Sequence, residues 1–342
     1  MYILIAILVF GFMIFIHELG HFMFAKKFGV AINEFSIGMG PKIFSKQGKD
    51  GVMYSLRLLP IGGYVAMEGE DEESDHPDSY NKKAPWKRFI IVIAGAMMNI
   101  LVSVLIFFII TLCTPRFGTT VIYDFAKDST SDDTGLKIND KIVEINGANV
   151  YTAGDLSYEI NMNGGEAVTV TVIRNGEKIT LSSVRFPTYE SQGVTFGVPD
   201  FTVYGENRSF SSVLKNTFHT CKFSVKSVWD SIAGLISGKY GLEQVSGPVG
   251  ITDAMSTAAK TGGAQTFFYL VALIGMNLGI MNLLPIPALD GGTLLLTFIE
   301  MVTKKKLPPR IENGIRAVGF ALIMLLAIVL IFKDTIFLIK RG

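Results

Sequence analysis

Four apolar segments constrain this chain more than any other feature of its sequence. They cover residues 2–25, 89–112, 267–284 and 317–332, and the last is short unless residues 336–339 extend it. A helix needs about 20 apolar residues to cross the hydrocarbon core of a bilayer. Hydrophobic residues make up 49% of the 342 residues and the mean hydropathy is +0.41, which favours a membrane protein over a soluble one. The sequence therefore predicts a polytopic α-helical membrane protein with about four transmembrane helices.

Basic residues predict the orientation of these spans. They flank the loop at residues 26–88 and recur between the third and fourth spans, as Lys26, Lys27, Lys82, Lys83, Lys87, Arg88, Lys304, Lys305, Lys306 and Arg310. By the positive-inside rule both loops are cytoplasmic, which places the termini and the long region after the second span outside. Lys340 and Arg341 run against this orientation. We expect the first span to be retained, because it lacks the basic segment and cleavage site of a signal peptide.

The first span ends in an H-E-x-x-H motif made of His17, Glu18 and His21. Residues four apart share one helix face, so both imidazoles can bind one metal ion with the glutamate beside them. These polar side chains are costly in hydrocarbon and tend to face a protein interior or a water-filled cavity. A catalytic zinc needs a third protein ligand, here a carboxylate or one of the other histidines, His76 and His219. The motif indicates hydrolysis inside a membrane.

Asp290 is the candidate for that third ligand. It is the only acidic residue between Asp253 and Glu300, and it lies in the segment NLLPIPALDGG at residues 282–292. Two prolines prevent a regular helix before it, and two glycines free the backbone after it. Irregular backbone at membrane depth is tolerated where it lines a cavity or is buried in protein. The alternative is an aspartate that caps a helix at the membrane surface.

Two further side chains in the third span, Asn277 and Asn282, carry amides that need hydrogen-bond partners in an apolar setting. One or both could bind the scissile carbonyl or the extended peptide of a substrate. A polar contact between helices is the alternative reading, since such contacts are common in membranes.

The loop after the first span has strand character. Residues 32–37 and 52–58 are predicted strands and residues 60–64 a turn, and Arg57 is the only charge between residues 52 and 66. This low charge argues against an ordinary cytoplasmic loop. A transmembrane substrate must unwind before its peptide bonds can be hydrolysed, and an edge strand could take over its hydrogen bonds by β-augmentation. Gly62 and Gly63 are the candidates for this substrate contact.

The region after the second span divides in two. Residues 168–173 alternate in polarity and Asn175-Gly176 is a hairpin turn signal. The segment GLKINDKIVEING at residues 135–147 resembles the corresponding stretch of PDZ domains, with residues 153–162 as the following helix. The alternative is an unrelated small β-rich domain. We predict a membrane part at 1–112, a PDZ-like domain at 115–200, an amphipathic helical region at 201–264 and a second membrane part at 265–342.

The amphipathic region centres on residues 210–236, where apolar residues recur every three or four positions. This helix could lie on the outer membrane face or pack against the PDZ-like domain, and the pattern favours neither.

The motifs HELGH (residues 17–21), FSIGMGP (35–41), PIGGYV (60–65), SGPVGI (246–251) and NLLPIPALDGG (282–292) occur in this order around the PDZ-like insert. The pattern resembles the site-2 protease family of intramembrane zinc metalloproteases, specifically its bacterial RseP-type branch, over essentially the whole chain. Some members carry two tandem PDZ domains, whereas this chain has room for one. Many relatives continue D-G-G with a histidine, which the family does not use as a ligand and which is Thr293 here.

The resemblance implies that His17, His21 and Asp290 bind Zn²⁺ and that Glu18 is the general base. It also implies that Asn282 handles substrate and that the strand-like loop is a membrane-associated β-hairpin. The implied activity is cleavage of transmembrane segments in single-span proteins already shortened outside, as in regulated intramembrane proteolysis of anti-sigma factors, or in remnant signal peptides.

Expected partners are these substrates, membrane lipids, and a peptide or substrate at the PDZ-like domain. The expected location is the bacterial inner (cytoplasmic) membrane, with the active site near the cytoplasmic face and the PDZ-like domain extracytoplasmic.

Two other classes compete with the protease. A non-enzymatic PDZ-bearing membrane scaffold with a structural metal would tolerate Glu18→Gln. A transporter also has broken helices and buried acids, but four spans without a visible internal repeat disfavour it. The net charge of +1 gives no sign of nucleic-acid binding. Two cysteines, Cys113 and Cys221, exclude a disulfide framework and a cysteine-rich zinc site.

Overall fold

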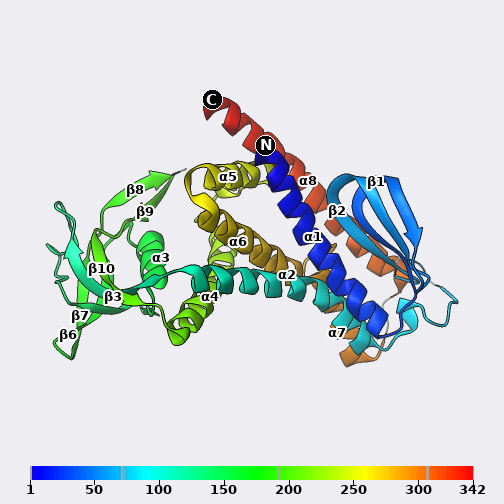
Figure 1. The fold of residues 1–342 in the computed structure, drawn as a ribbon, viewed down its shortest axis with the longest axis horizontal. Coiled ribbons are helices and arrows are strands. Elements are labelled where there is room, and N and C mark those ends of the chain that lie inside the picture. Colours follow the sequence, from blue (N-terminus) through cyan, green and yellow to red (C-terminus); the bar gives the residue numbers. More distant parts are fainter. Residues whose placement is uncertain (1, 71, 73, 192, 306–307, 342) are drawn as a thin grey trace. The chain divides into compact units, whose positions relative to one another are not determined.

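The computed structural model of the chain describes residues 2–70, 72, 74–191, 193–305 and 308–341 (Figure 1). It contains two compact units. One comprises Met1–Ile106 with Val245–Gly342, and the other Phe107–Gln244. The first unit holds the helices α1 (Tyr2–Lys27), most of α2 (Pro85–Cys113), α5 (Pro248–Thr261), α6 (Gly263–Leu283), α7 (Asp290–Thr303) and α8 (Pro309–Arg341), with a short 3₁₀ turn η1 (Tyr80–Lys82).

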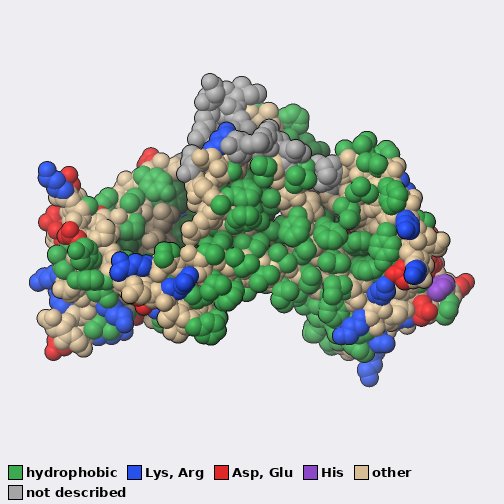
Figure 2. All heavy atoms as spheres, viewed as in Figure 1, with side chains coloured by type: hydrophobic (Ala, Val, Ile, Leu, Met, Phe, Trp, Pro, Cys, Tyr) green, Lys and Arg blue, Asp and Glu red, His purple; other side chains and the backbone are tan. Residues whose placement is uncertain are grey.

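The predicted apolar segments are helices. Among the described residues, four helical stretches are long and apolar enough to cross a membrane: Ile5–Lys27, Pro85–Cys113, Gly263–Leu283 and Gly314–Ile336. Their outward side chains are apolar too, and on α8 Val318, Phe320 and Leu322 are each more than 60% exposed. Figure 2 shows hydrophobic side chains over the helices and charged ones mainly over the strand-rich parts and loops. Because apolar surface of this extent is unfavourable in water, the chain is a multi-pass membrane protein.

The loop between α1 and α2 forms an antiparallel hairpin that folds back on itself. Its strands are β1 (Ile32–Gln47) and β2 (Met53–Met67). The central part of β1 is paired on both sides, since Phe35 lies opposite Val65 and Tyr54. The segments therefore lie in the order 63–67, 32–37, 53–57 and 42–47, with residues 63–67 at one edge.

The prediction of a turn at residues 60–64 is wrong. These residues continue β2, and the strand changes direction there instead of ending. Gly62 has a φ of +90°, a conformation that glycine adopts without steric cost. Gly62 therefore bends a strand and does not connect two strands.

The second unit is built on an antiparallel sheet with the strand order β10-β3-β4-β6-β7. Its strands are β3 (Arg116–Phe125), β4 (Lys141–Ile145), β5 (Ala148–Asn149, paired with β4), β6 (Val168–Arg174), β7 (Glu177–Val184) and β10 (Phe201–Asn207). A separate hairpin consists of β8 (Thr188–Ser191) and β9 (Val194–Gly197). The sheet runs past residue 200, because β10 pairs with β3. We call residues 116–207 the sheet domain, and its assignment as PDZ-like stays a prediction.

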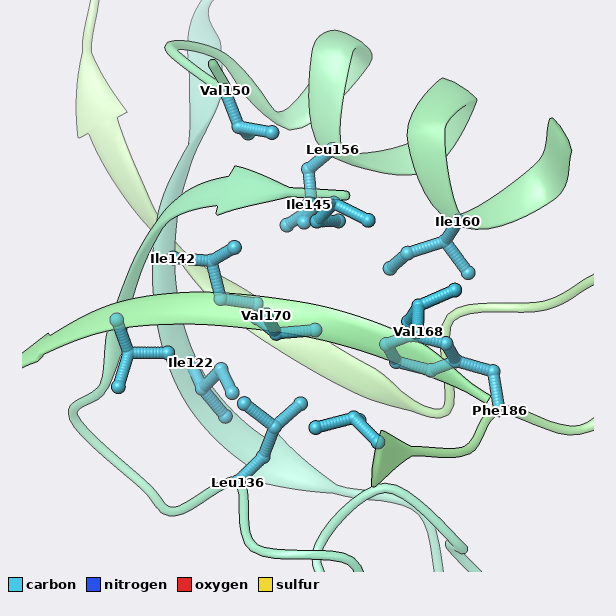
Figure 3. Packing of buried hydrophobic residues seen from close by; sticks show 12 residues of the cluster. Ile122, Leu136, Ile142, Ile145, Val150, Leu156, Ile160, Val168, Val170 and Phe186 are labelled. Atoms are coloured by element: carbon cyan, nitrogen blue, oxygen red, sulfur yellow. The ribbon is translucent and has the colours of Figure 1, made fainter. Parts of the chain in front are cut away.

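Local sequence explains the sheet domain well. Asn175 and Gly176 both have positive φ at the β6–β7 turn, as the predicted hairpin requires. The helix α3 (Ala153–Asn163) matches the predicted helix and begins with a capping box between Thr152 and Asp155. Its buried side chains meet those of β4 and β6 in one apolar core (Figure 3), including Leu156, Ile160, Ile142, Ile145, Val168 and Val170.

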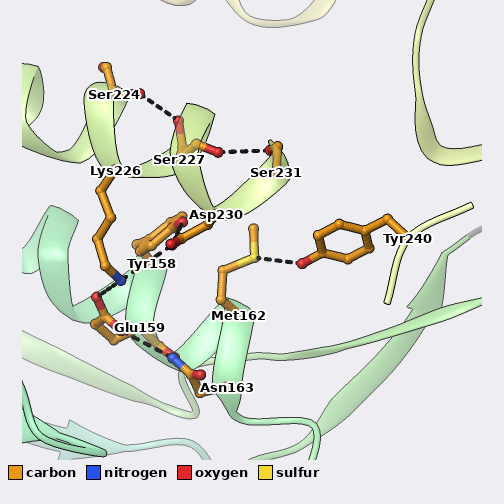
Figure 4. Close-up of polar contacts among 10 residues, drawn as sticks. All are labelled: Tyr158, Glu159, Met162, Asn163, Ser224, Lys226, Ser227, Asp230, Ser231 and Tyr240. Atoms are coloured by element: carbon orange, nitrogen blue, oxygen red, sulfur yellow. Dashed lines mark hydrogen bonds and ion pairs between the residues drawn. The ribbon is translucent and has the colours of Figure 1, made fainter. Parts of the chain in front are cut away.

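The amphipathic segment is the helix α4 (Phe210–Ile236), followed by the 3₁₀ turn η2 (Leu242–Gln244). Figure 4 shows how α4 is fixed to α3 by polar contacts. The Lys226 ammonium lies 2.6 Å from Glu159 and 3.4 Å from Asp230, and the Tyr158 hydroxyl donates to Asp230 at 2.5 Å. Burial, followed by the bond to Asp230, raises the pKa of Tyr158, so its hydroxyl stays protonated as the donor.

Candidate metal centre

Two histidines of α1 form one side of the centre. His17 and His21 are one turn apart and buried, and their Nε2 atoms are 3.1 Å from each other. The Nδ1 atom of His21 lies 2.9 Å from the carbonyl oxygen of Ile91 on α2. A carbonyl can only accept, so Nδ1 carries the proton and Nε2 keeps its lone pair. The His21 side chain is thereby oriented as a metal ligand.

Asp290 completes the cluster from the first residue of α7. Its Oδ2 atom lies 3.0 Å from Nε2 of His17 and 3.3 Å from Nε2 of His21. The helix α6 ends at Leu283 and α7 begins at Asp290, so the proline-containing segment between them is non-helical, as predicted. Ala288 in this segment has a φ of +74°. The broken helix is what turns the Asp290 carboxylate toward α1.

Close packing explains why two glycines follow Asp290. A Cβ atom on Gly291 would lie 1.9 Å from the carbonyl oxygen of Leu284, and one on Gly292 would lie 2.6 Å from that of Ile286. Neither distance is sterically possible for a side chain. The non-helical segment therefore folds tightly onto the first turn of α7, and this close approach requires both glycines.

The three side chains fit a divalent metal ion. Their ligand atoms all lie within 4.8 Å of one another. Among the described residues, the buried Oδ2 atom of Asp290 has no hydrogen-bond partner, which is costly unless a cation satisfies it. Two imidazole nitrogens and one carboxylate oxygen are a donor set typical of catalytic zinc, which leaves one coordination position open.

Glu18 lies between this cluster and the edge of the hairpin. The backbone amide of Val65 is hydrogen-bonded to its carboxylate. A Cβ atom on Gly63 would lie 3.6 Å from Cγ of Glu18, so the predicted residue Gly63 is its neighbour. Gly62 instead packs against Met39, and its role in the described structure is to bend β2.

The predicted asparagines differ in position. The Nδ2 atom of Asn282 lies 3.5 Å from Nδ1 of His17, next to the cluster. Asn277 lies in the same helix, and its buried Oδ1 atom has no hydrogen-bond partner among the residues that the structure describes. Sequence reasoning missed Asn99, whose Nδ2 atom is also 3.5 Å from Nδ1 of His17. It is the only amide side chain in the apolar segment at residues 89–112, and this was an available signal.

Comparison with known proteins identifies the family of the chain. The model of peptidase family M50 matches residues 5–326. A protein of Clostridium acetobutylicum, itself named only as a candidate zinc metalloprotease, is 37% identical over 98% of this chain and 97% of its own length. Two proteins named zinc metalloprotease RasP are also similar. That of Shouchella clausii is 30% identical, with 96% of this chain and 97% of the relative covered. That of Geobacillus kaustophilus is 29% identical, with 96% of each covered.

The match spans nearly the whole chain, including α1 with its two histidines and α7 with Asp290. The chain therefore belongs to peptidase family M50, the site-2 protease family, and is a zinc metalloprotease.

Proposed function

We propose that this protein is an intramembrane endopeptidase that cleaves the transmembrane segments of single-span substrates. The observation that carries the proposal is the metal cluster itself. His17 and His21 lie within a helix of membrane-spanning length, and Asp290 follows the end of another, with all three ligand atoms within 4.8 Å. Helices of this length and hydrophobicity are not needed for a zinc centre in a soluble protein, whereas a centre that acts inside a membrane requires them.

In this mechanism His17, His21 and Asp290 hold the zinc ion. When bound, zinc supplies Lewis acidity and lowers the pKa of water from 15.7 to about 7. Glu18, one residue from the first ligand, accepts the proton of the attacking water and delivers it to the departing amine. Its bond to the Val65 amide holds the carboxylate beside the hairpin edge, where the substrate would lie.

Substrate binding is proposed at residues 63–67 of β2. One side of this segment pairs with β1, and the amide of Val65 points away from β1 toward Glu18. Alternate residues of a strand direct their backbone groups to the same side, so Gly63 also presents its amide and carbonyl there. An unwound substrate segment could pair with this edge, which would bring a peptide bond next to Glu18. Asn282, close to the cluster, is placed to bind the substrate carbonyl.

Glu18→Gln tests the mechanism. We expect cleavage of a model transmembrane substrate to fall by at least 10³-fold because the proton acceptor is lost, while bound zinc is unchanged. Zinc content and cleavage should be measured on the same preparation of full-length protein. Equal cleavage by wild type and variant would favour the alternative, a membrane scaffold with a structural metal.

We further propose that the protein lies in the bacterial cytoplasmic membrane with the sheet domain outside. Basic residues at both loops between spans support this orientation. The metal ligands lie near the basic end of α1, because Lys26 and Lys27 are in its last turn. The sheet domain would then limit access of untrimmed substrates or bind a substrate peptide.

Membrane lipids are proposed to contact α4. Its buried face includes Val213, Thr217 and Val228, and the adjoining face exposes an apolar stripe of Phe210, Leu214, Phe218, Val225, Trp229 and Ile236. The start of α4 is tied to the end of a membrane span, since the Arg208 guanidinium donates to the carbonyl of Leu112 at 2.6 Å. A helix with an apolar stripe beside a membrane span is suited to the bilayer surface.

Fluorescence of Trp229 tests this contact. In a Trp86→Phe background, brominated lipids in proteoliposomes should quench its emission, because the indole would lie at the level of the acyl chains. Emission that responds to an aqueous quencher and not to brominated lipids would exclude α4 from the membrane.

A further inference from the structure

One face of α2 forms the wall behind the two histidines. Ile91, Gly95 and Asn99 are four residues apart and therefore lie along one side of this helix. Ile91 accepts from His21 through its carbonyl. A Cβ atom on Gly95 would lie 2.4 Å from Nε2 of His21 and 3.0 Å from Cε1 of His17, so only glycine leaves room for both rings. Asn99 is the third position of this wall and lies against His17.

The Nδ1–H group of His17 needs a hydrogen-bond acceptor, as the Nδ1–H group of His21 has in the carbonyl of Ile91. Its Nε2 atom points to Asp290, so the lone pair for a metal must be on Nε2 and the proton on Nδ1. A buried N–H group requires an acceptor. In the described part of the chain, the groups recorded within 3.5 Å of Nδ1 are the side-chain amides of Asn99 and Asn282. One Nδ1–H can be satisfied by one of these amide oxygens.

Burial separates the two candidates. Asn99 is 0% exposed, and its buried Oδ1 atom has no hydrogen-bond partner in the part of the chain that the structure describes. Asn282 is only partly buried. A 180° turn of the Asn99 amide would place its oxygen at Nδ1 of His17 and end the unsatisfied state of that oxygen. The same rotation of Asn282 would engage its amide with His17, although its partial exposure makes this amide the better placed of the two to bind a substrate.

We propose that Asn99 is a positioning residue for His17. Its amide oxygen accepts from Nδ1–H, fixes the tautomer and ring orientation that the zinc site requires, and leaves Asn282 free for the substrate. This inference rests on the proposed zinc site. Partners of this kind typically change metal affinity by about 10- to 100-fold when they are removed.

The test is zinc affinity of the full-length protein in detergent, measured by chelator competition after zinc has been removed. Asn99→Leu keeps the branched shape of the side chain but removes the acceptor, and it should weaken zinc binding by about 10- to 100-fold. Asn99→Asp restores an acceptor and should bind zinc within a few-fold of wild type. Asn99→Ser, whose hydroxyl is too short to reach His17, gives the same comparison without apolar bulk if the leucine variant does not fold.

Two controls make the assignment specific. Ser103→Ala changes the next position of the same helix face, where the hydroxyl donates to the Asn99 carbonyl, and should leave zinc affinity unchanged. Asn282→Leu should retain zinc affinity and raise KM for the substrate.

Zinc affinity that is unchanged in Asn99→Leu or Asn99→Ser, or lost in Asn282→Leu alone, would overturn the inference. Failure of wild type itself to bind zinc would instead contradict the proposed function.

Discussion

At the scale of single residues, the metal centre depends on glycines that let backbone segments approach closely as much as on the side chains that bind the metal. Gly95 lets α2 approach both imidazoles, and Gly291 lets the segment before α7 fold under Asp290. Neither glycine carries a functional group, yet each permits a ligand to reach its position. The metal centre therefore depends on residues that a search for acids, bases and histidines does not find.

Gly95→Ala tests this dependence. The added methyl group would lie 2.4 Å from Nε2 of His21, so α1 and α2 must move apart and zinc binding should fall by at least 10-fold. Zinc content by elemental analysis measures the effect. The matched control is Gly314→Ala in α8, where a Cβ atom meets nothing within 4 Å. The idea is falsified if both variants hold zinc equally.

At the scale of elements, the hairpin is fixed by a polar cluster on the face opposite Phe35. Arg57 donates to Glu34 and Ser36 across the strands, at 2.9 Å and 3.0 Å, and Lys42 lies 3.1 Å from Glu34. Burial alone would raise the pKa of Glu34, but the polar groups of Ser55, Arg57 and Lys42 around its carboxylate outweigh burial and lower the pKa to about 2.

The pH dependence of hairpin stability follows from this shift. A carboxyl whose pKa is about 2 when folded and about 4.3 when unfolded contributes stability above pH 5, which is lost as the pH falls toward 2. We expect the Tm of wild type to exceed that of Glu34→Gln at pH 6 and the difference to shrink by pH 3. The exposed Glu72→Gln serves as control. A difference that does not vary with pH would rule out this role for Glu34.

The attachment of α4 to α3 depends on Lys226, which lies between the carboxylates of Glu159 and Asp230. Lys226→Met leaves the nearly buried Glu159 without its cation. Because Lys226 is itself partly exposed, the expected loss is about 1 kcal/mol. Hydrogen exchange should speed up in α4 relative to wild type, and exposed Lys215→Met should not change it. Unchanged α4 exchange in Lys226→Met would show that apolar packing alone holds the helix.

At the scale of the whole molecule, we propose that peptide-bond hydrolysis takes place in the membrane part and that the sheet domain controls which substrates reach it. This predicts a dependence on substrate shape. A single-span substrate with a short outer segment should be cleaved by the full-length protein at least 10-fold faster than the same span carrying a folded outer domain. Substrate concentration series in proteoliposomes measure both rates. Equal rates would remove the sheet domain from substrate selection.

Local sequence was enough to predict the spans, the shared face of His17 and His21, and Asp290 as a candidate ligand, because each depends on local periodicity or on the few acids in apolar sequence. The three-dimensional packing was needed to show that Asp290 reaches both histidines, that β2 continues through residues 60–64, and that Asn99 lies behind His17. These contacts join residues 26 to 273 positions apart, and their geometry depends on how closely packed elements approach one another. Such distances are set by helix packing and by single glycines, which local sequence patterns do not encode.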